Sequence, residues 1–214
     1  MFDWLKRRIG ASQKGALPPE VAAMLDRASA LLENDDMQNS LLPEEVRQAI
    51  VGGTSCDTVP GARGEFGHTS DNPIPVNGPL GEVLYLSHLR TAKGVPLLFH
   101  RMGSAAALLG GLDIYVDIYE VLPMEKGARS ELLFFSMYHP RKSHLAPNGY
   151  LIDRSRDPGN EIYGVSWLVE DFPNALDAHI RKWQMESLGI PLSINKVRTY
   201  LNGSPFAPSP PLPR

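Results

Sequence analysis

Residues 114–122 read IYVDIYEVL, a run of β-branched and aromatic side chains that is typical of a β-strand. Runs of similar character lie at 83–89, 95–101 and 132–138, and shorter ones at 150–152 and 163–168. Most of the gaps between them are short and turn-like, which favours antiparallel hairpins over the long crossovers of a parallel sheet. The sequence therefore predicts a mostly antiparallel sheet of four to six strands.

Helices are predicted on both sides of this sheet along the chain. Apolar residues recur at spacings of three and four after Pro19, and a shorter helix begins at Pro43. Helical patterns return over residues 171–188 and 193–203. The chain is thus predicted to be an α+β protein, with N- and C-terminal helices flanking the sheet.

Three parts follow from these patterns. Residues 1–51 form an N-terminal helical arm, residues 52–203 form a single α+β domain, and residues 204–214 form a proline-rich tail. The chain has 214 residues, of which 43% are hydrophobic, and this suits one domain of ordinary size. The tail has five prolines in eleven residues, which predicts an exposed polyproline segment that could recruit a partner.

Composition argues against several classes of protein. The formal net charge of −3 shows no global bias toward nucleic acid. Cys56 is the only cysteine, so no intramolecular disulfide can form, and a reducing, cytoplasmic setting is the simplest interpretation. No apolar stretch approaches the roughly 20 residues of a membrane span, and the N-terminus lacks the apolar core of a signal peptide. We therefore expect no membrane or nucleic-acid partner.

The first candidate site is the segment 139–144, HPRKSH, directly after a predicted strand. Pro140 cannot continue the strand, so the chain turns and presents the polar groups together. The guanidinium and the ammonium could bind a carboxylate or phosphate, and either imidazole could transfer a proton near neutral pH. The alternative is a solvated basic turn whose histidines cap backbone groups. The candidate ligand-binding residues are Arg141, Lys142 and Ser143, and the candidate catalytic residues are His139 and His144.

A second candidate site lies where the strand predicted at 95–101 ends. His100 is a candidate catalytic residue, and Arg101 and Ser104 are candidate ligand-binding residues next to a turn at Gly103. The alternative is that His100 forms hydrogen bonds within the core while Arg101 extends its charge to solvent.

A third candidate is the loop at 66–79, which is rich in proline, glycine and asparagine. Such a rigid loop suits either a binding loop or a strap that covers one edge of the sheet, and we favour the strap. Within the loop, His68 is the candidate ligand-binding residue.

No metal site and no cofactor are predicted. The six histidines include no pair with the helical spacing of a zinc motif, and the chain has no nucleophile elbow, P-loop or dinucleotide-binding fingerprint. Asp57 lies next to Cys56, and its negative charge is expected to raise the pKa of the thiol, which argues against an activated thiolate.

Three phrases of the sequence resemble those of a bacterial protein family. They are residues 72–82, NPIPVNGPLGE, residues 99–104, FHRMGS, and residues 138–143, YHPRKS. The resemblance covers about residues 60 to 152, roughly the predicted sheet and the loop before it. The family is an uncharacterised one with no assigned activity, so the resemblance implies a bacterial setting and no particular function.

Two functions fit these residues. In the first, the chain is a cytoplasmic binding or interaction protein, of a regulatory or immunity type, whose basic His/Arg face recognises an anionic small molecule or an acidic protein surface. In the second, it is a metal-independent enzyme acting on a phosphate- or carboxylate-bearing substrate. His100 or His139 would then act as acid or base, and Arg101 with Arg141 would stabilise negative charge. The enzyme requires these groups to meet in a pocket.

Overall fold

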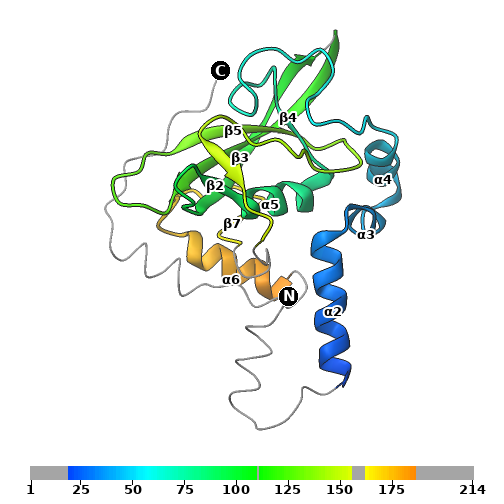
Figure 1. The fold of residues 1–214 in the computed structure, drawn as a ribbon, viewed down its shortest axis with the longest axis vertical. Coiled ribbons are helices and arrows are strands. Elements are labelled where there is room, and N and C mark those ends of the chain that lie inside the picture. The colour runs from blue at the N-terminus through cyan, green and yellow to red at the C-terminus, as the bar shows by residue number, and fades with distance from the viewer. Residues whose placement is uncertain (1–18, 110, 156–161, 187–214) are drawn as a thin grey trace.

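The computed structural model describes residues 19–109, 111–155 and 162–186, and its main feature is a curled sheet (Figure 1). The sheet has five strands in the order β1-β5-β4-β3-β7. Its strands are β1 (Ile74–Pro75), β3 (Leu97–Leu109), β4 (Leu112–Pro123), β5 (Glu131–Ser136) and β7 (Gly164–Val165). The β3–β4 and β4–β5 pairs are antiparallel, whereas β1 and β7 join the two edges in parallel. The predicted α+β fold with a mostly antiparallel sheet is confirmed.

Five helices and a smaller sheet surround these strands in the described part of the chain. The arm contains α2 (Pro19–Glu33), α3 (Asp35–Ser40) and α4 (Glu44–Val51), and the later helices are α5 (Gly78–His88) and α6 (Leu176–Glu186). A two-stranded antiparallel sheet pairs β2 (Leu89–Thr91) with β6 (Tyr150–Ile152). In Figure 1, α2 extends away from the sheet, while α3 and α4 lie beside it.

The central strand β4 separates two differently covered faces. Side chains alternate along a strand, so Tyr119 and Glu120 point to opposite faces. The Tyr119 hydroxyl donates to Glu82 of α5 at 2.8 Å, whereas Glu120 contacts His100, whose ring stacks on Phe172. The run IYVDIYEVL therefore forms a strand that is covered by α5 on one face and by the segment before α6 on the other.

One predicted strand is wrong, because residues 83–88 form the second half of α5 instead. Eight of the 11 residues of α5 are buried, so the helix has no polar face to give its sequence a helical period. Gly78, at the start of the helix, has a φ of 75°, a conformation that glycine adopts without strain. Only Leu89, the last residue of the predicted strand, lies in a strand, β2.

The strand predicted at 95–101 is much longer than its sequence indicates. It continues as β3 to Leu109 and pairs with β4 as far as Leu112, so the predicted gap at 102–113 is mostly a hairpin. The register shifts between Arg101 and Gly103, which is a β-bulge. Residues 103–107 are glycine, serine and alanine, which have low strand propensity, so pairing with β4 determines their conformation.

The loop at 66–79 covers an edge of the sheet, as predicted. Ile74 and Pro75 form β1 and pair with Phe135 and Ser136 of β5. Further back, the carbonyl of Gly67 accepts a hydrogen bond from the Phe134 amide at 2.9 Å. The loop thus acts as a strap along β5.

The terminal predictions are confirmed only in part. The helix predicted at 171–188 begins at Leu176, and the predicted inward residues Leu176 and Ile180 are buried. The helix predicted at 193–203 and the tail at 204–214 lie outside the described residues. Within the described ranges, no helix is both long enough and apolar enough to cross a membrane.

Candidate functional site

Buried amide side chains attach α3 of the arm to the sheet domain. Asn77, just before α5, donates from Nδ2 to Gln38 Oε1 at 3.0 Å and to Asn39 Oδ1 at 3.1 Å. Asn39 in turn donates to the carbonyl of Pro140 at 2.9 Å. Buried polar groups are costly unless they are paired, and these bonds pair them. They therefore hold α3 in a defined position beside the 139–144 segment.

Lys142 extends this attachment. Its Nζ donates to Gln38 Oε1 at 3.0 Å and forms an ion pair with Asp35 in the first turn of α3. Burial lowers the pKa of Lys142, and the Asp35 carboxylate opposes that shift. One of the predicted ligand-binding residues is thus already bound to a carboxylate of the arm.

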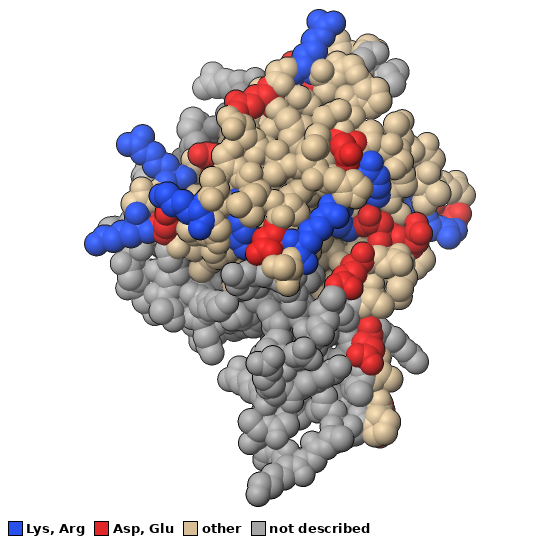
Figure 2. Space-filling view, in the orientation of Figure 1, with Lys and Arg blue, Asp and Glu red and all other residues tan. Residues whose placement is uncertain are grey.

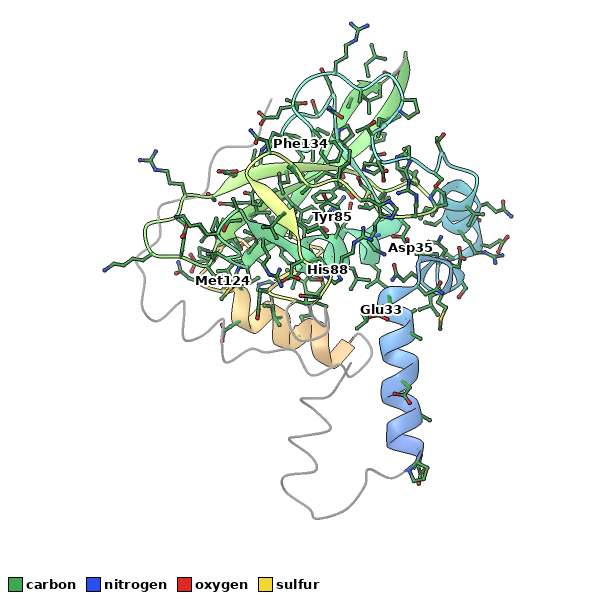
Figure 3. All side chains as sticks on the ribbon, viewed as in Figure 1. Glu33, Asp35, Tyr85, His88, Met124 and Phe134 are labelled. Carbon is green, nitrogen blue, oxygen red and sulfur yellow. The ribbon has the colours of Figure 1, made fainter. Side chains whose placement is uncertain are left out.

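A cavity of about 260 Å³ lies next to this ion pair. Glu33 and Asp35 line it from the arm, and Tyr85 and His88 line it from α5 (Figure 3). The other lining residues are Leu32, Lys142, Ser143, His144, Ile152 and Arg154. Four segments far apart in the sequence therefore surround one small hollow. Pockets for drug-sized ligands are usually somewhat larger, so this cavity suits a small molecule.

His88 is held in one orientation at this cavity. Its Nδ1 donates to the carbonyl of Asp153 at 2.9 Å, which leaves Nε2 as the nitrogen with a free lone pair. No described group hydrogen-bonds to that Nε2. Burial lowers the pKa of His88, and the nearby charges of Lys142 and Arg154 lower it further. The ring is therefore neutral near pH 7 and able to accept a proton or a hydrogen bond.

Arg154 supplies an uncompensated positive charge. It lines the cavity, and no described carboxylate forms a salt bridge with it. Burial lowers the pKa values of both His88 and Lys142, and the charge of Arg154 adds to both shifts. A charge that affects two side chains in this way lies close to both of them. Positive charge therefore converges on one side of the cavity.

His139 lies in the interior rather than at the cavity. Its Nδ1 donates to the carbonyl of Thr54 at 2.8 Å, and its Nε2 accepts from Ser136 Oγ at 2.9 Å. Burial lowers the pKa of His139, which is 6% exposed. Both ring nitrogens are occupied, so the imidazole joins the loop at Thr54 to the end of β5.

The remaining residues of the 139–144 segment bind the loop that contains Asp57. The Asp57 carboxylate accepts from Arg141 Nη1 at 2.7 Å and from the His144 amide at 2.9 Å. Ser143 is buried, and its hydroxyl donates to the carbonyl of Asp57 at 2.8 Å. The hydrogen bond from Arg141 is the largest cause that lowers the pKa of Asp57. Lys142, Ser143 and His144 line the cavity, whereas the charge of Arg141 is compensated by Asp57.

His100 is part of the core. Its Nε2 donates to Glu120 Oε2 at 3.0 Å, and its Nδ1 accepts from the Val169 amide at 3.1 Å. Its ring stacks on Phe172 with the centroids 4.2 Å apart. Because β4 lies between β3 and β5, His100 and His139 belong to separate clusters. His100 therefore corresponds to the second interpretation of the sequence, in which it forms hydrogen bonds within the core.

Arg101 and Ser104 contact each other and the same carboxylate. Arg101 Nη2 donates to Ser104 Oγ and to Asp117 Oδ1, each at 2.6 Å, and Ser104 Oγ donates to Asp117 at 2.7 Å. The third predicted segment is also separate, since His68 Nε2 donates to the carbonyl of Asn148 at 3.1 Å. None of these three residues lines the cavity at His88.

Sequence reasoning missed Glu33, Asp35, His88 and Arg154. His88 was placed at the end of a predicted strand, and Arg154 follows β6 without any motif around it. Neither position carries a local signal, because the cavity forms only when the arm docks against α5 and β6. The only indication in the sequence was for Arg154, which lies in a stretch, residues 126–156, where basic residues outnumber acidic ones.

Cys56 and the metal-ligating residues form no further site within the described ranges. Burial is the largest cause that raises the pKa of the Cys56 thiol, and Asp57 adds a smaller effect of the expected sign. Among the residues that the structure describes, no group of three or more His, Cys, Asp or Glu side chains could hold a metal ion.

Comparisons with known proteins do not assign a function: no family model, no curated protein and no solved structure matches the chain.

Proposed function

We propose that this protein is a bacterial cytoplasmic binding protein that holds a small anionic molecule in the cavity between the arm and α5. The observation that carries the proposal is Arg154, a cation that lines the cavity and has no described carboxylate partner. Arginine binds carboxylate and phosphate oxygens in pairs, and a partly enclosed site strengthens that attraction. Cys56, the single cysteine of the sequence, fits the cytoplasmic setting.

Neighbouring groups support an anion at this position. Lys142 also lines the cavity, and its ion pair with Asp35 largely compensates its charge. A neutral His88 can accept a hydrogen bond at Nε2 from a ligand hydroxyl or from a protonated acid. An anion that enters would pair with Arg154, whose charge no described carboxylate balances, and this is the physical reason for it to bind there.

Charge on the surface favours a small ligand over an acidic protein partner. Figure 2 shows basic and acidic side chains next to one another across the middle of the visible face. Arg141 is paired with Asp57, and Arg101 is paired with Asp117. Pairing of this kind weakens the field that would attract an acidic protein, whereas Arg154 lines a cavity and forms no salt bridge with a described residue.

A regulatory role is consistent with the cavity being lined by residues from two parts of the chain. Leu32, Glu33 and Asp35 belong to the arm, and the other lining residues belong to the sheet domain. A ligand bound between them would stabilise the docked position of the arm, because it would bind the docked form only.

The second candidate function is enzymatic, and one observation favours it. His88 has a fixed tautomer with a free Nε2 next to two cations, which is the arrangement of a general base beside an anion-binding site. In this hypothesis His88 takes the acid–base role for which the sequence had suggested His100 or His139.

Thermal unfolding with a panel of anions tests the proposed function. The panel contains phosphate, sulfate, propionate, succinate and glutarate, and the proteins are the wild type, Arg154→Gln and Arg129→Gln. An anion at about a hundred times its Kd stabilises the wild type by roughly 2.7 kcal/mol. We expect this shift to be lost in Arg154→Gln and retained in Arg129→Gln, which removes an exposed arginine of the β4–β5 loop. Equal shifts in all three proteins, or no shift with any anion, would overturn the proposal.

A further inference from the structure

Two charges of opposite sign, neither of which forms a salt bridge with a described residue, line the same cavity. Arg154 lines it after β6, and Glu33 lines it at the end of α2. Neither forms a salt bridge with the other or with any other described residue. They are therefore too far apart to neutralise each other directly, yet both face the small volume that a ligand would fill.

The negative charge lies on the arm side of the cavity. Figure 3 shows Glu33 and Asp35 across from Tyr85 and His88 of α5. Asp35 is already engaged by Lys142, so its charge is largely compensated. Glu33 is the acidic residue of the lining that keeps an uncompensated charge within the described part of the chain. A ligand at Arg154 therefore also experiences the field of Glu33.

This arrangement disfavours a simple anion in comparison with a ligand that carries both charges. A plain carboxylate gains the attraction of Arg154 but is repelled by Glu33 across a cavity of about 260 Å³. A molecule with a carboxylate at one end and an ammonium group at the other satisfies both residues. Both side chains are exposed to solvent, so each single attraction is weak, and a ligand that pairs with both gains from the two together.

On the basis of the proposed function, we infer that the ligand is zwitterionic, a small amino acid or a similar compound whose carboxylate binds Arg154 and whose ammonium group binds Glu33. The ammonium group of such a ligand donates to the Glu33 carboxylate, as a lysine side chain would. The apolar lining residues Leu32 and Ile152 contact the carbon skeleton. The cavity volume of about 260 Å³ is slightly below the usual range for drug-sized ligands, so the ligand is a small molecule.

Matched pairs of ligands test the inference by isothermal titration calorimetry. The members of each pair differ mainly by an amino group: propionate and alanine, succinate and aspartate, glutarate and glutamate. We expect the amino member of the best pair to bind the wild type at least about tenfold more tightly than its partner, the ratio that one additional ion pair of modest strength gives. Glu33→Gln should remove most of this preference and leave the affinity of the plain carboxylate unchanged or higher.

Two control variants make the test specific. Glu20→Gln makes the same charge change on the same helix, about 20 Å from Glu33, and should keep the wild-type preference. Arg154→Gln should weaken both members of the pair. Equal affinity for both members, or a preference that survives Glu33→Gln, overturns the zwitterionic ligand while the anion site stands. Failure of every carboxylate, amino acid and phosphate to bind overturns both the inference and the proposed function.

Discussion

At the scale of single residues, Glu82 is the most unusual side chain of the core. It is fully buried in α5, and its Oε2 accepts from Tyr119 at 2.8 Å, while its Oε1 has no hydrogen-bond partner. Burial raises the pKa of Glu82 well above its ordinary value of 4.5, and the negative charge of Asp117 raises it further. The folded protein therefore favours the protonated, neutral form of this carboxyl group.

We predict that Glu82→Gln stabilises the protein above about pH 4.5, the ordinary pKa of glutamate, and has little effect below it. In the wild type, the unfolded chain loses the Glu82 proton before the folded chain does. Stability is therefore lost as the pH rises from the unfolded pKa toward the raised folded pKa. Glutamine has nearly the same shape and does not titrate. Urea unfolding at a series of pH values measures the difference, with Asp113→Asn as an exposed control on β4. Parallel pH curves for Glu82→Gln and the wild type would contradict this account.

His139 gives the opposite dependence on pH. Its folded pKa lies below the ordinary value of 6.5, so the unfolded chain takes up a proton first as the pH falls. The stability that comes from the neutral ring is present above about pH 6.5 and is lost as the pH decreases toward the folded pKa.

We predict that His139→Asn flattens the loss of stability below about pH 6.5, although it lowers stability at higher pH through lost packing. The asparagine amide can still donate to the carbonyl of Thr54, and it does not titrate. Urea unfolding between about pH 5 and pH 8 measures how steeply the free energy of unfolding changes with pH in the variant and in the wild type. A variant whose stability declines as steeply as that of the wild type in this range would show that His139 is not a source of the dependence.

At the scale of elements, the docking of α3 depends on a few amide hydrogen bonds. Asn39 accepts from Asn77 and donates to the carbonyl of Pro140; both asparagines are buried, and Pro140 is half-buried. A buried partner that is left without its hydrogen bond costs about 1–3 kcal/mol.

We predict that Asn39→Ala destabilises the protein by about 1–3 kcal/mol, because it leaves the Pro140 carbonyl unpaired. Gln48→Ala on α4 removes an exposed side chain that bonds only to Glu44, and it should cost less than about 0.5 kcal/mol. Urea unfolding provides both values. If Asn39→Ala is as mild as Gln48→Ala, the amide cluster is not what holds α3 in place.

The elements also show how far the sequence predicts the fold. The composition of residues 114–122 and 132–138 correctly predicts β4 and β5, because strands select β-branched and aromatic side chains even where both faces are covered. It fails for α5, where burial on all sides removes the helical period. It also fails for residues 102–109, whose glycine and alanine become a strand only through pairing with β4. Local composition therefore identifies strands rich in β-branched and aromatic residues, but not a helix that is buried on all sides or a strand built from small residues.

At the scale of the whole molecule, the cavity joins residues that no local pattern connects. Glu33 and Asp35 come from the arm, His88 from α5, Lys142 from the turn after β5 and Arg154 from the chain after β6. The sequence correctly singled out Lys142, Ser143 and His144 as polar groups in one turn. It could not show that Asp57 compensates Arg141, or that His88 and not His139 lines the cavity, because these contacts depend on tertiary structure.

The most direct test of the central claim is a titration of the ¹⁵N-labelled protein with glutarate and with glutamate, followed by amide chemical shifts. The account predicts saturable shifts at residues 33–35, His88, 142–144 and 152–154, and their loss in Arg154→Gln. A separate cavity lies beside the β3–β4 hairpin, where Arg63 and Asp71 line it, and the amide shifts of its residues should remain unchanged. Saturable shifts centred on that separate cavity, or no saturable shifts with either ligand, would contradict the account.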